Sequence, residues 1–206
     1  MKELETRAYS FEIRADETDR GRRITGRPIV YGQRTDLGYF DEIIEPGALN
    51  DADLRDVRFL VNHDTRRIPL ARSRRNNGNS TMTLYPNELG LDIDVLLDTE
   101  NNTEARALYS AVQRGDISGM SFMFSIDDEE WEDLESDHPT RHVRKIGTVV
   151  EVSACTFPAY SETAINARSK EALDSARSAV DTARQQNAKS VDTDLALAKE
   201  KLKLYF

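Results

Sequence analysis

Ser121 lies in a segment whose residue alternation predicts a β-strand. Within residues 117–126, positions 120, 122, 124 and 126 all carry large apolar side chains, the pattern of a strand with one buried face. Ser121 then lies on the opposite face, where its hydroxyl could meet a substrate. A serine on such a face is also common without any chemical role, so the pattern alone leaves both interpretations open. The segment is not the Gly-x-Ser-x-Gly nucleophile elbow, because Met123 replaces the second glycine.

A nucleophilic serine needs a neutral imidazole to take its proton, and the chain contains three histidines. His63 directly follows a predicted strand over residues 57–62, so its backbone is anchored. His138 and His142 belong to the acidic, proline-containing insertion around residues 135–141, which is typical of a surface loop without a scaffold. We therefore expect His63 to be the general base. The alternative for His63 is a partly buried histidine that hydrogen-bonds to backbone.

Glu151 is the candidate for the group that accepts the other imidazole proton. It lies in a strongly β-forming run, residues 146–156, where a lone buried carboxylate is costly unless it is paired. The alternation of this run also allows Glu151 simply to occupy an exposed face. The predicted catalytic set is thus Ser121 as nucleophile, His63 as general base and Glu151 as the residue that orients the imidazole.

Neither a metal nor a cofactor is expected. The pair His63-Asp64 and the spacing of His138 and His142 offer too few ligands, and no glycine-rich phosphate loop occurs. The single cysteine, Cys155, excludes an internal disulfide and a multi-cysteine zinc site.

The elements that must position these residues are mostly strands. A capping threonine, an apolar stripe and Gly115 predict a helix over residues 103–114, and Pro46 indicates a short helix over residues 45–49. From residue 168 the composition becomes rich in alanine and charge, which predicts a helical or disordered extension (168–206) after a domain spanning 1–167. The fold class expected is mainly β with flanking helices. Eight strands are predicted, over residues 6–14, 23–31, 41–44, 57–62, 81–86, 90–97, 118–126 and 145–156.

Composition limits the partners. A net charge of −9 argues against a general nucleic-acid binder, and the lack of a long apolar run argues against a membrane span, so a soluble, cytosolic protein is expected. Five arginines fall within residues 66–75 and eight acidic side chains within residues 127–137. Both runs are interpreted either as solvated loops or as surfaces that face each other or partners of opposite charge.

Seven short blocks follow one another along the chain: GRPIVYG (26–32), EIIEPGAL (42–49), FLVNHD (59–64), ELGL (88–91), GDISGMSF (115–122), VEVS (150–153) and FPAY (157–160). In content and order they resemble the prohead maturation proteases of tailed phages, a family related in fold to the herpesvirus maturation proteases. The resemblance covers about residues 5–167, and it implies that the histidine of the third block and the second serine of the fifth are catalytic. Departures are Met123, where the family usually has glycine, and Tyr160, where it usually has asparagine.

The resemblance implies a closed or partly open β-barrel of the herpesvirus-protease type. It also implies a serine endopeptidase that acts in the host cytoplasm, inside the assembling procapsid. Its partners would be the major capsid protein with its scaffolding segment, and itself, through self-cleavage or a homo-oligomer. The alternative is an inactive scaffolding or adaptor protein on the same fold.

Overall fold

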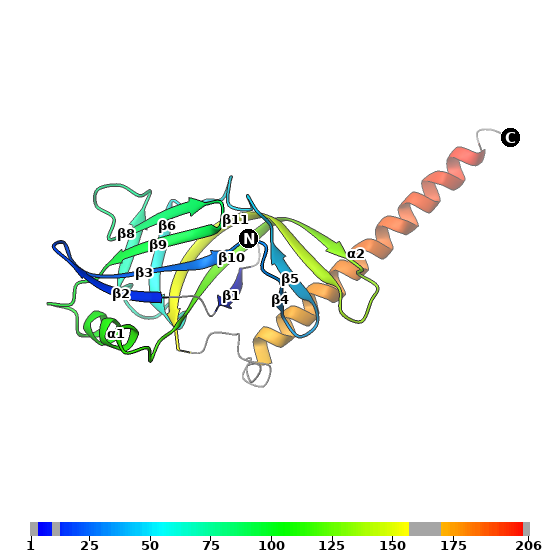
Figure 1. The fold of residues 1–206 in the computed structure, drawn as a ribbon. Helices are drawn as coiled ribbons and strands as arrows, with labels where there is room; N and C mark the ends of the chain where they lie inside the picture. The colour runs from blue at the N-terminus through cyan, green and yellow to red at the C-terminus, as the bar shows by residue number, and fades with distance from the viewer. Residues whose placement is uncertain (1–3, 10–12, 157–169, 204–206) are drawn as a thin grey trace.

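The computed structural model describes residues 4–9, 13–156 and 170–203, which form two β-sheets and two helices (Figure 1). The seven-stranded sheet has the order β1-β10-β11-β5-β4, with β6 beside β11 and β7 beside β6. Its strands are β1 (Glu5–Tyr9), β4 (Thr35–Asp36), β5 (Asp41–Ile44), β6 (Asp56–Val61), β7 (Ala71–Arg74), β10 (Gly119–Glu132) and β11 (Thr140–Cys155).

The second sheet contains four antiparallel strands in the order β2-β3-β9-β8. Helix α1 packs against β2 and β3. The two sheets share one core, in which apolar side chains of β3 and β9 meet those of β6, β10 and β11. The elements not yet given are β2 (Ile13–Thr18), β3 (Gly21–Val30), β8 (Met82–Asn87), β9 (Gly90–Leu96), α1 (Thr103–Gln113) and α2 (Lys170–Lys203).

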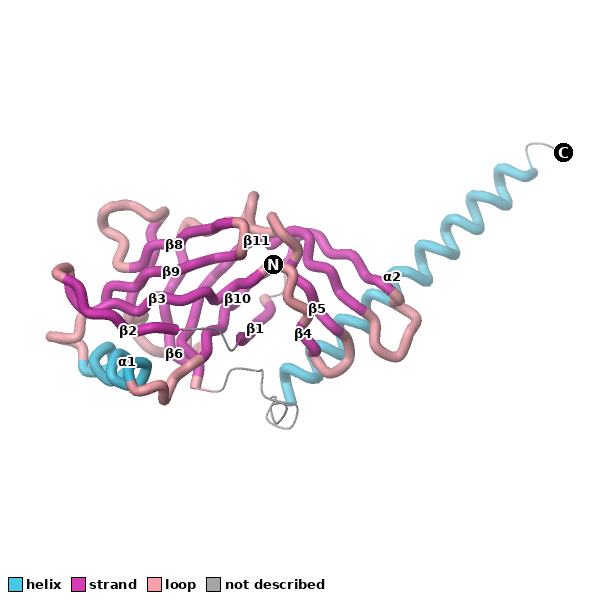
Figure 2. Tube along the Cα trace, viewed as in Figure 1, coloured by secondary structure: helices cyan, strands magenta, loops and turns pink. Residues whose placement is uncertain are grey.

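The mainly β class with flanking helices is confirmed, but no closed barrel is found. The strand pairings of the described ranges form two separate hydrogen-bonded sheets (Figure 2). Strands β10 and β11 are both long, and the register of their pairing shifts four times between Met123 and Glu129. Such bulges bend strands and increase their twist. These bulges do not join the two sheets, so the barrel expected from the resemblance is not confirmed in the described ranges.

Several local predictions were wrong in instructive ways. The predicted strand 6–14 is two strands, β1 and β2, that belong to different sheets. Residues 46–51 form turns instead of a short helix. The cap of α1 is Asn102, whose side chain accepts hydrogen bonds from the backbone N–H groups of Glu104 and Ala105, so Thr103 is already inside the helix.

The acidic run is divided between a strand and a turn. Residues 127–132 form the distal part of β10, and residues 133–137 lie in the turn before β11. Arg141 and Arg144, on β11, pair with Glu129 and Glu130 on β10, and Arg144 also contacts Asp128. Opposite charges on facing strands stabilise the pairing of β10 with β11. The composition of the acidic segment alone is typical of an unstructured loop. The arginine run after His63 pairs with other acids, including Asp56, Asp64 and Glu104.

Helix α2 begins against the β4–β5 region and the β10–β11 hairpin and then extends away from them (Figure 1). Ala176 and Val180 are buried against Phe40, and Arg184 donates hydrogen bonds to the backbone carbonyls of Leu134 and Ser136. The predicted helical form of the tail is thus observed over residues 170–203. Within the described part of the chain, neither helix is long and apolar enough to cross a membrane.

Candidate active site

Ser121 and His63 meet near the first residues of β10 in the seven-stranded sheet, with Ser121 Oγ 2.5 Å from His63 Nε2. Ser121 lies near the start of β10, where Met120, Phe122 and Phe124 point into the core as the alternation predicted. Ser121 was expected on the opposite face, where its hydroxyl could meet a substrate. Its side chain is fully buried, with the Arg7 carbonyl and the His63 ring both within hydrogen-bond distance of Oγ.

His63 is held by the turn that follows β6. The parallel register of β6 and β11 places Val61 beside Ala154, so the next residues reach the end of β11. Asn62 and His63 both have left-handed backbone angles, with φ of 51° and 57°. Such angles in non-glycine residues cost about 1–3 kcal/mol each and persist only where surrounding contacts hold them. The amide side chain of Asn62 provides such contacts, because it bonds to both the backbone N–H and the hydroxyl of Thr156.

Glu151 lies on β11 with 1% of its surface exposed, so the exposed-face alternative for this residue was wrong. One carboxylate oxygen contacts His63 Nδ1, and the other accepts a hydrogen bond from Ser153 Oγ at 2.6 Å. Both oxygens of this buried charge therefore have a partner, as burial requires. The three residues selected from the sequence lie in one chain of contacts: Ser121, His63, Glu151.

Ser153 is the residue of this site that sequence reasoning did not select. It is fully buried, and in addition to Glu151 it contacts the backbone N–H of His63, which donates to Ser153 Oγ at 3.2 Å. One hydroxyl thus links the backbone of the base to the carboxylate that orients its ring. The spacing of Glu151 and Ser153, two residues apart on a strand and so on one face, was the signal that could have found it.

The pKa of His63 is raised to about 9. Burial acts to lower the pKa, but hydrogen bonds between the ring and the side chains of Cys155 and Glu151, together with the negative charge of Glu151, favour the imidazolium. The raised pKa thus favours a ring that carries protons on both nitrogens. In that state Nε2–H donates to Ser121 Oγ, and the Ser121 hydroxyl donates to the backbone carbonyl of Arg7, 2.6 Å away on β1.

The other two histidines lie elsewhere. His142 is part of β11, not of a loop, and contacts Glu45 and Glu132. His138 Nε2 lies 3.2 Å from Asp41. Asp36, Asp41 and His138 are also the one group in the described ranges whose ligand atoms are close enough to share a metal ion, and they are mostly exposed.

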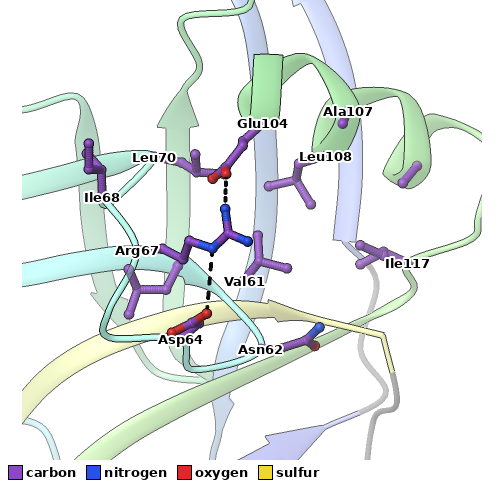
Figure 3. A pocket seen from close by; sticks show the side chains of 12 residues that line it. Val61, Asn62, Asp64, Arg67, Ile68, Leu70, Glu104, Ala107, Leu108 and Ile117 are labelled. Atoms are coloured by element: carbon purple, nitrogen blue, oxygen red, sulfur yellow. Dashed lines mark hydrogen bonds and ion pairs between the residues drawn. The ribbon is translucent and has the colours of Figure 1, made fainter. Parts of the chain in front are cut away.

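A pocket of about 430 Å³ adjoins the His63 turn. Figure 3 shows it between the turn after β6 and the helix α1, with Asn62 and Asp64 on one wall and Leu108 on the other. Arg67 spans the pocket and pairs with both Glu104 and Asp64. The wall is otherwise largely apolar, from residues including Leu60, Leu70 and Ile117.

With this geometry in view, the comparisons with known proteins identify the family. The sequence pattern that defines the caudovirus prohead serine proteases matches residues 9–177. The chain belongs to this family. The resemblance of the seven ordered blocks to the prohead proteases is thereby confirmed, although the last block, 157–160 with its Tyr160 departure, lies outside the described residues.

One curated relative is similar over much of the chain. The prohead protease of Enterobacteria phage HK97 is 32% identical over 130 residues, which cover 61% of this chain and 52% of that protein. The chain thus spans about half the length of this relative. No solved structure matches the chain significantly, so the likeness to the herpesvirus fold stays a prediction.

Proposed function

We propose that the chain is a serine endopeptidase that cleaves capsid and scaffold protein during procapsid maturation. One observation carries the proposal: Ser121 Oγ lies 2.5 Å from His63 Nε2, while His63 Nδ1 contacts the buried carboxylate of Glu151. A serine, an imidazole and a carboxylate in one chain of hydrogen bonds are the parts that acyl transfer requires. Membership in a family of serine proteases supports the same chemistry.

In this mechanism His63 must first be neutral, with its proton on Nδ1 donated to Glu151. Ser121 Oγ then attacks the scissile carbonyl carbon while Nε2 accepts the hydroxyl proton. The resulting imidazolium is stabilised by Glu151, and Nε2 returns the proton to the leaving amine. Backbone N–H groups hold the oxyanion, and water enters by the same route to release the acyl group.

The substrate assignment rests on the family and on the HK97 relative, a prohead protease. The partners proposed are the major capsid protein and its scaffolding segment, met inside the assembling procapsid in the host cytoplasm. A second proposed substrate is the chain itself, cut near residue 168, where the composition changes from that of the domain to that of the tail.

Co-expression with the phage capsid protein tests the activity. Wild-type chain should convert the capsid protein to a shorter product of defined mass, and Ser121→Ala should leave it intact. Ser125→Ala is the matched control, because Ser125 is a buried serine on the same strand whose hydroxyl instead accepts from the backbone N–H of Thr148. Unchanged capsid mass with wild-type chain would favour the inactive scaffold or adaptor.

Intact masses of the purified chain test self-cleavage. Wild-type protein should lose a C-terminal fragment over time, and Ser121→Ala should not. Identical full-length masses for both proteins would contradict self-cleavage without affecting the proposal for the capsid substrate.

A further inference from the structure

The strand β1 lies beside the strand that carries the nucleophile, and its backbone contacts the Ser121 hydroxyl. It pairs antiparallel with β10, with Ala8 opposite Ser121, and the Ser121 hydroxyl donates a hydrogen bond to the Arg7 carbonyl at 2.6 Å. Together with the His63 ring, whose Nε2 lies 2.5 Å from Oγ, this contact leaves none of the Ser121 side chain exposed. No substrate can reach the hydroxyl while β1 occupies this position.

The position of β1 is one that an extended peptide can take. Among the described strands β1 pairs with β10 alone, at one end of the sheet order, so it can leave without breaking another strand pairing. The vacated edge of β10 then offers backbone N–H and C=O groups to a peptide in the same direction. Addition of a strand to a sheet edge is a common mode of peptide recognition.

The Arg7 side chain enters a site built of buried charges. Its Nε donates to Glu42 Oε1 at 2.5 Å and its Nη2 to Glu42 Oε2 at 2.7 Å, a bidentate pair. Nη2 also contacts Glu5, and the guanidinium carbon lies 5.6 Å from the centre of the Phe124 ring. The Glu42 side chain has no exposed surface, so its charge depends on this partner.

Without β1 the site keeps an excess of negative charge. Glu42, Glu129 and Arg141 remain, two negative charges and one positive. The nearest remaining cation to Glu42 is Arg141, whose Nη1 is 3.5 Å away. A buried carboxylate with so weak a partner favours an incoming cation.

Arg141 provides a second specificity contact. Its Nη1 and Nη2 donate hydrogen bonds to the Glu5 carboxylate at 2.9 and 3.0 Å, and only 4% of the Arg141 surface is exposed. Glu5 and Arg7 are two residues apart on one strand and share a face. The site is therefore complementary to an acid two residues before a base.

Resting on the proposed protease function, we propose that β1 occupies the place of the substrate and that Glu42 selects an arginine or lysine side chain there. The basic residue of the substrate is the one whose backbone carbonyl lies next to the Ser121 hydroxyl. Arg141 favours an acidic residue two positions before it in the substrate. β1 itself is held in a non-productive pose. Its Arg7 carbonyl presents the oxygen to the Ser121 hydroxyl as a hydrogen-bond acceptor, so the hydroxyl proton points away from His63.

Two quenched-fluorescent peptides test the specificity on the full chain. Both carry the sequence of residues 5–8, Glu-Thr-Arg-Ala, within identical flanks, but in the second peptide the arginine is replaced by glutamine. We expect kcat/KM to be roughly 10- to 100-fold higher for the arginine peptide, the range of a charge-assisted hydrogen bond. Glu42→Gln should reduce this ratio to nearly one, and Glu45→Gln, an acid just after β5, should not change it.

Binding separates the two proposals. The affinity of Ser121→Ala for the same peptides, measured by fluorescence anisotropy, should show the same preference for arginine without any hydrolysis. Hydrolysis that needs Ser121 but proceeds equally on both peptides, or equal affinities, would overturn the specificity and leave the protease intact. Hydrolysis that persists in Ser121→Ala would overturn the protease function, and the anisotropy would still decide the specificity. Because the peptide pair is compared on one protein, a Glu42→Gln variant that fails to fold does not affect the test.

Discussion

Glu151 and Glu42 are buried carboxylates of the same sheet, each about 1% exposed, but different kinds of partner neutralise them. Glu151 is held by His63 and Ser153, which belong to the body of the domain. Glu42 is held by Arg7, which belongs to a terminal strand of the sheet. The first arrangement holds a proton-transfer group in place. The second is a charged site whose occupant can be exchanged.

The largest effect on activity is expected from a substitution of Glu151, the first of the two buried carboxylates compared above. Glu151→Gln keeps the shape but removes the charge that orients and stabilises the His63 imidazolium. We expect kcat to fall about 10⁴-fold, as for the equivalent change in a serine-protease triad. Peptide hydrolysis rates measure this, with circular dichroism as the control for folding. A loss below about threefold would exclude Glu151 from the catalytic set.

The next effect is the pH dependence that Glu151 imposes through His63. Because the base must be neutral and its pKa is raised to about 9, kcat/KM should rise with pH and level off above 9. At pH 7 it should be about 100-fold below the plateau, since activity changes tenfold per unit below the pKa. Glu151→Gln removes one cause of the raised pKa, so its profile should level off at lower pH. A wild-type profile already flat at pH 7 would contradict the raised pKa.

The substitution Arg7→Ala tests the Glu42 side of the comparison, because it removes the arginine that pairs with Glu42. It removes the charge-assisted hydrogen bonds that hold β1 on Ser121, worth about 1.5–3 kcal/mol. Since a peptide must displace β1, we expect kcat/KM for the arginine peptide to rise roughly tenfold or more. Arg23→Ala is the matched control, because Arg23 pairs with Asp94 in the other sheet. A lower activity for Arg7→Ala with an unchanged control would show that β1 supports the site and does not block it.

The smallest effect on kcat is expected from Ser153→Ala, which tests how Glu151 and His63 are oriented. The hydroxyl donates to Glu151 and accepts from the His63 backbone, so its loss should weaken the orientation of both without removing a charge. A net loss of about 1 kcal/mol corresponds to a roughly fivefold lower kcat. Ser153→Thr keeps the hydroxyl and should recover most of the activity if the hydrogen bonds are the cause.

The positions of the main strands and of α1 followed from local patterns. The alternation around Ser121 predicted which neighbours point into the core, and Met120, Phe122 and Phe124 are indeed fully buried. The misses have physical causes. β4, at two residues, is too short to show a period, and β7 carries two arginines of the run that was interpreted as a loop or a charged surface. The acidic end of β10 depends on arginines of β11 that only the folded hairpin brings alongside.

The sequence by itself determined the mainly β class, because period-two alternation is a local property, and it held the family blocks. Ser121, His63 and Glu151 were candidates by residue type, and the resemblance to the family favoured Ser121 and His63 over their alternatives. The tertiary structure decided which residues touch. The parallel pairing of β6 with β11 brings His63 to Glu151, 88 positions away, and the pairing of β1 with β10 brings Arg7 to Ser121, 114 positions away. Strand pairing joins segments that no local pattern connects, so the burial of Ser121 beside β1 could be found only in the folded chain.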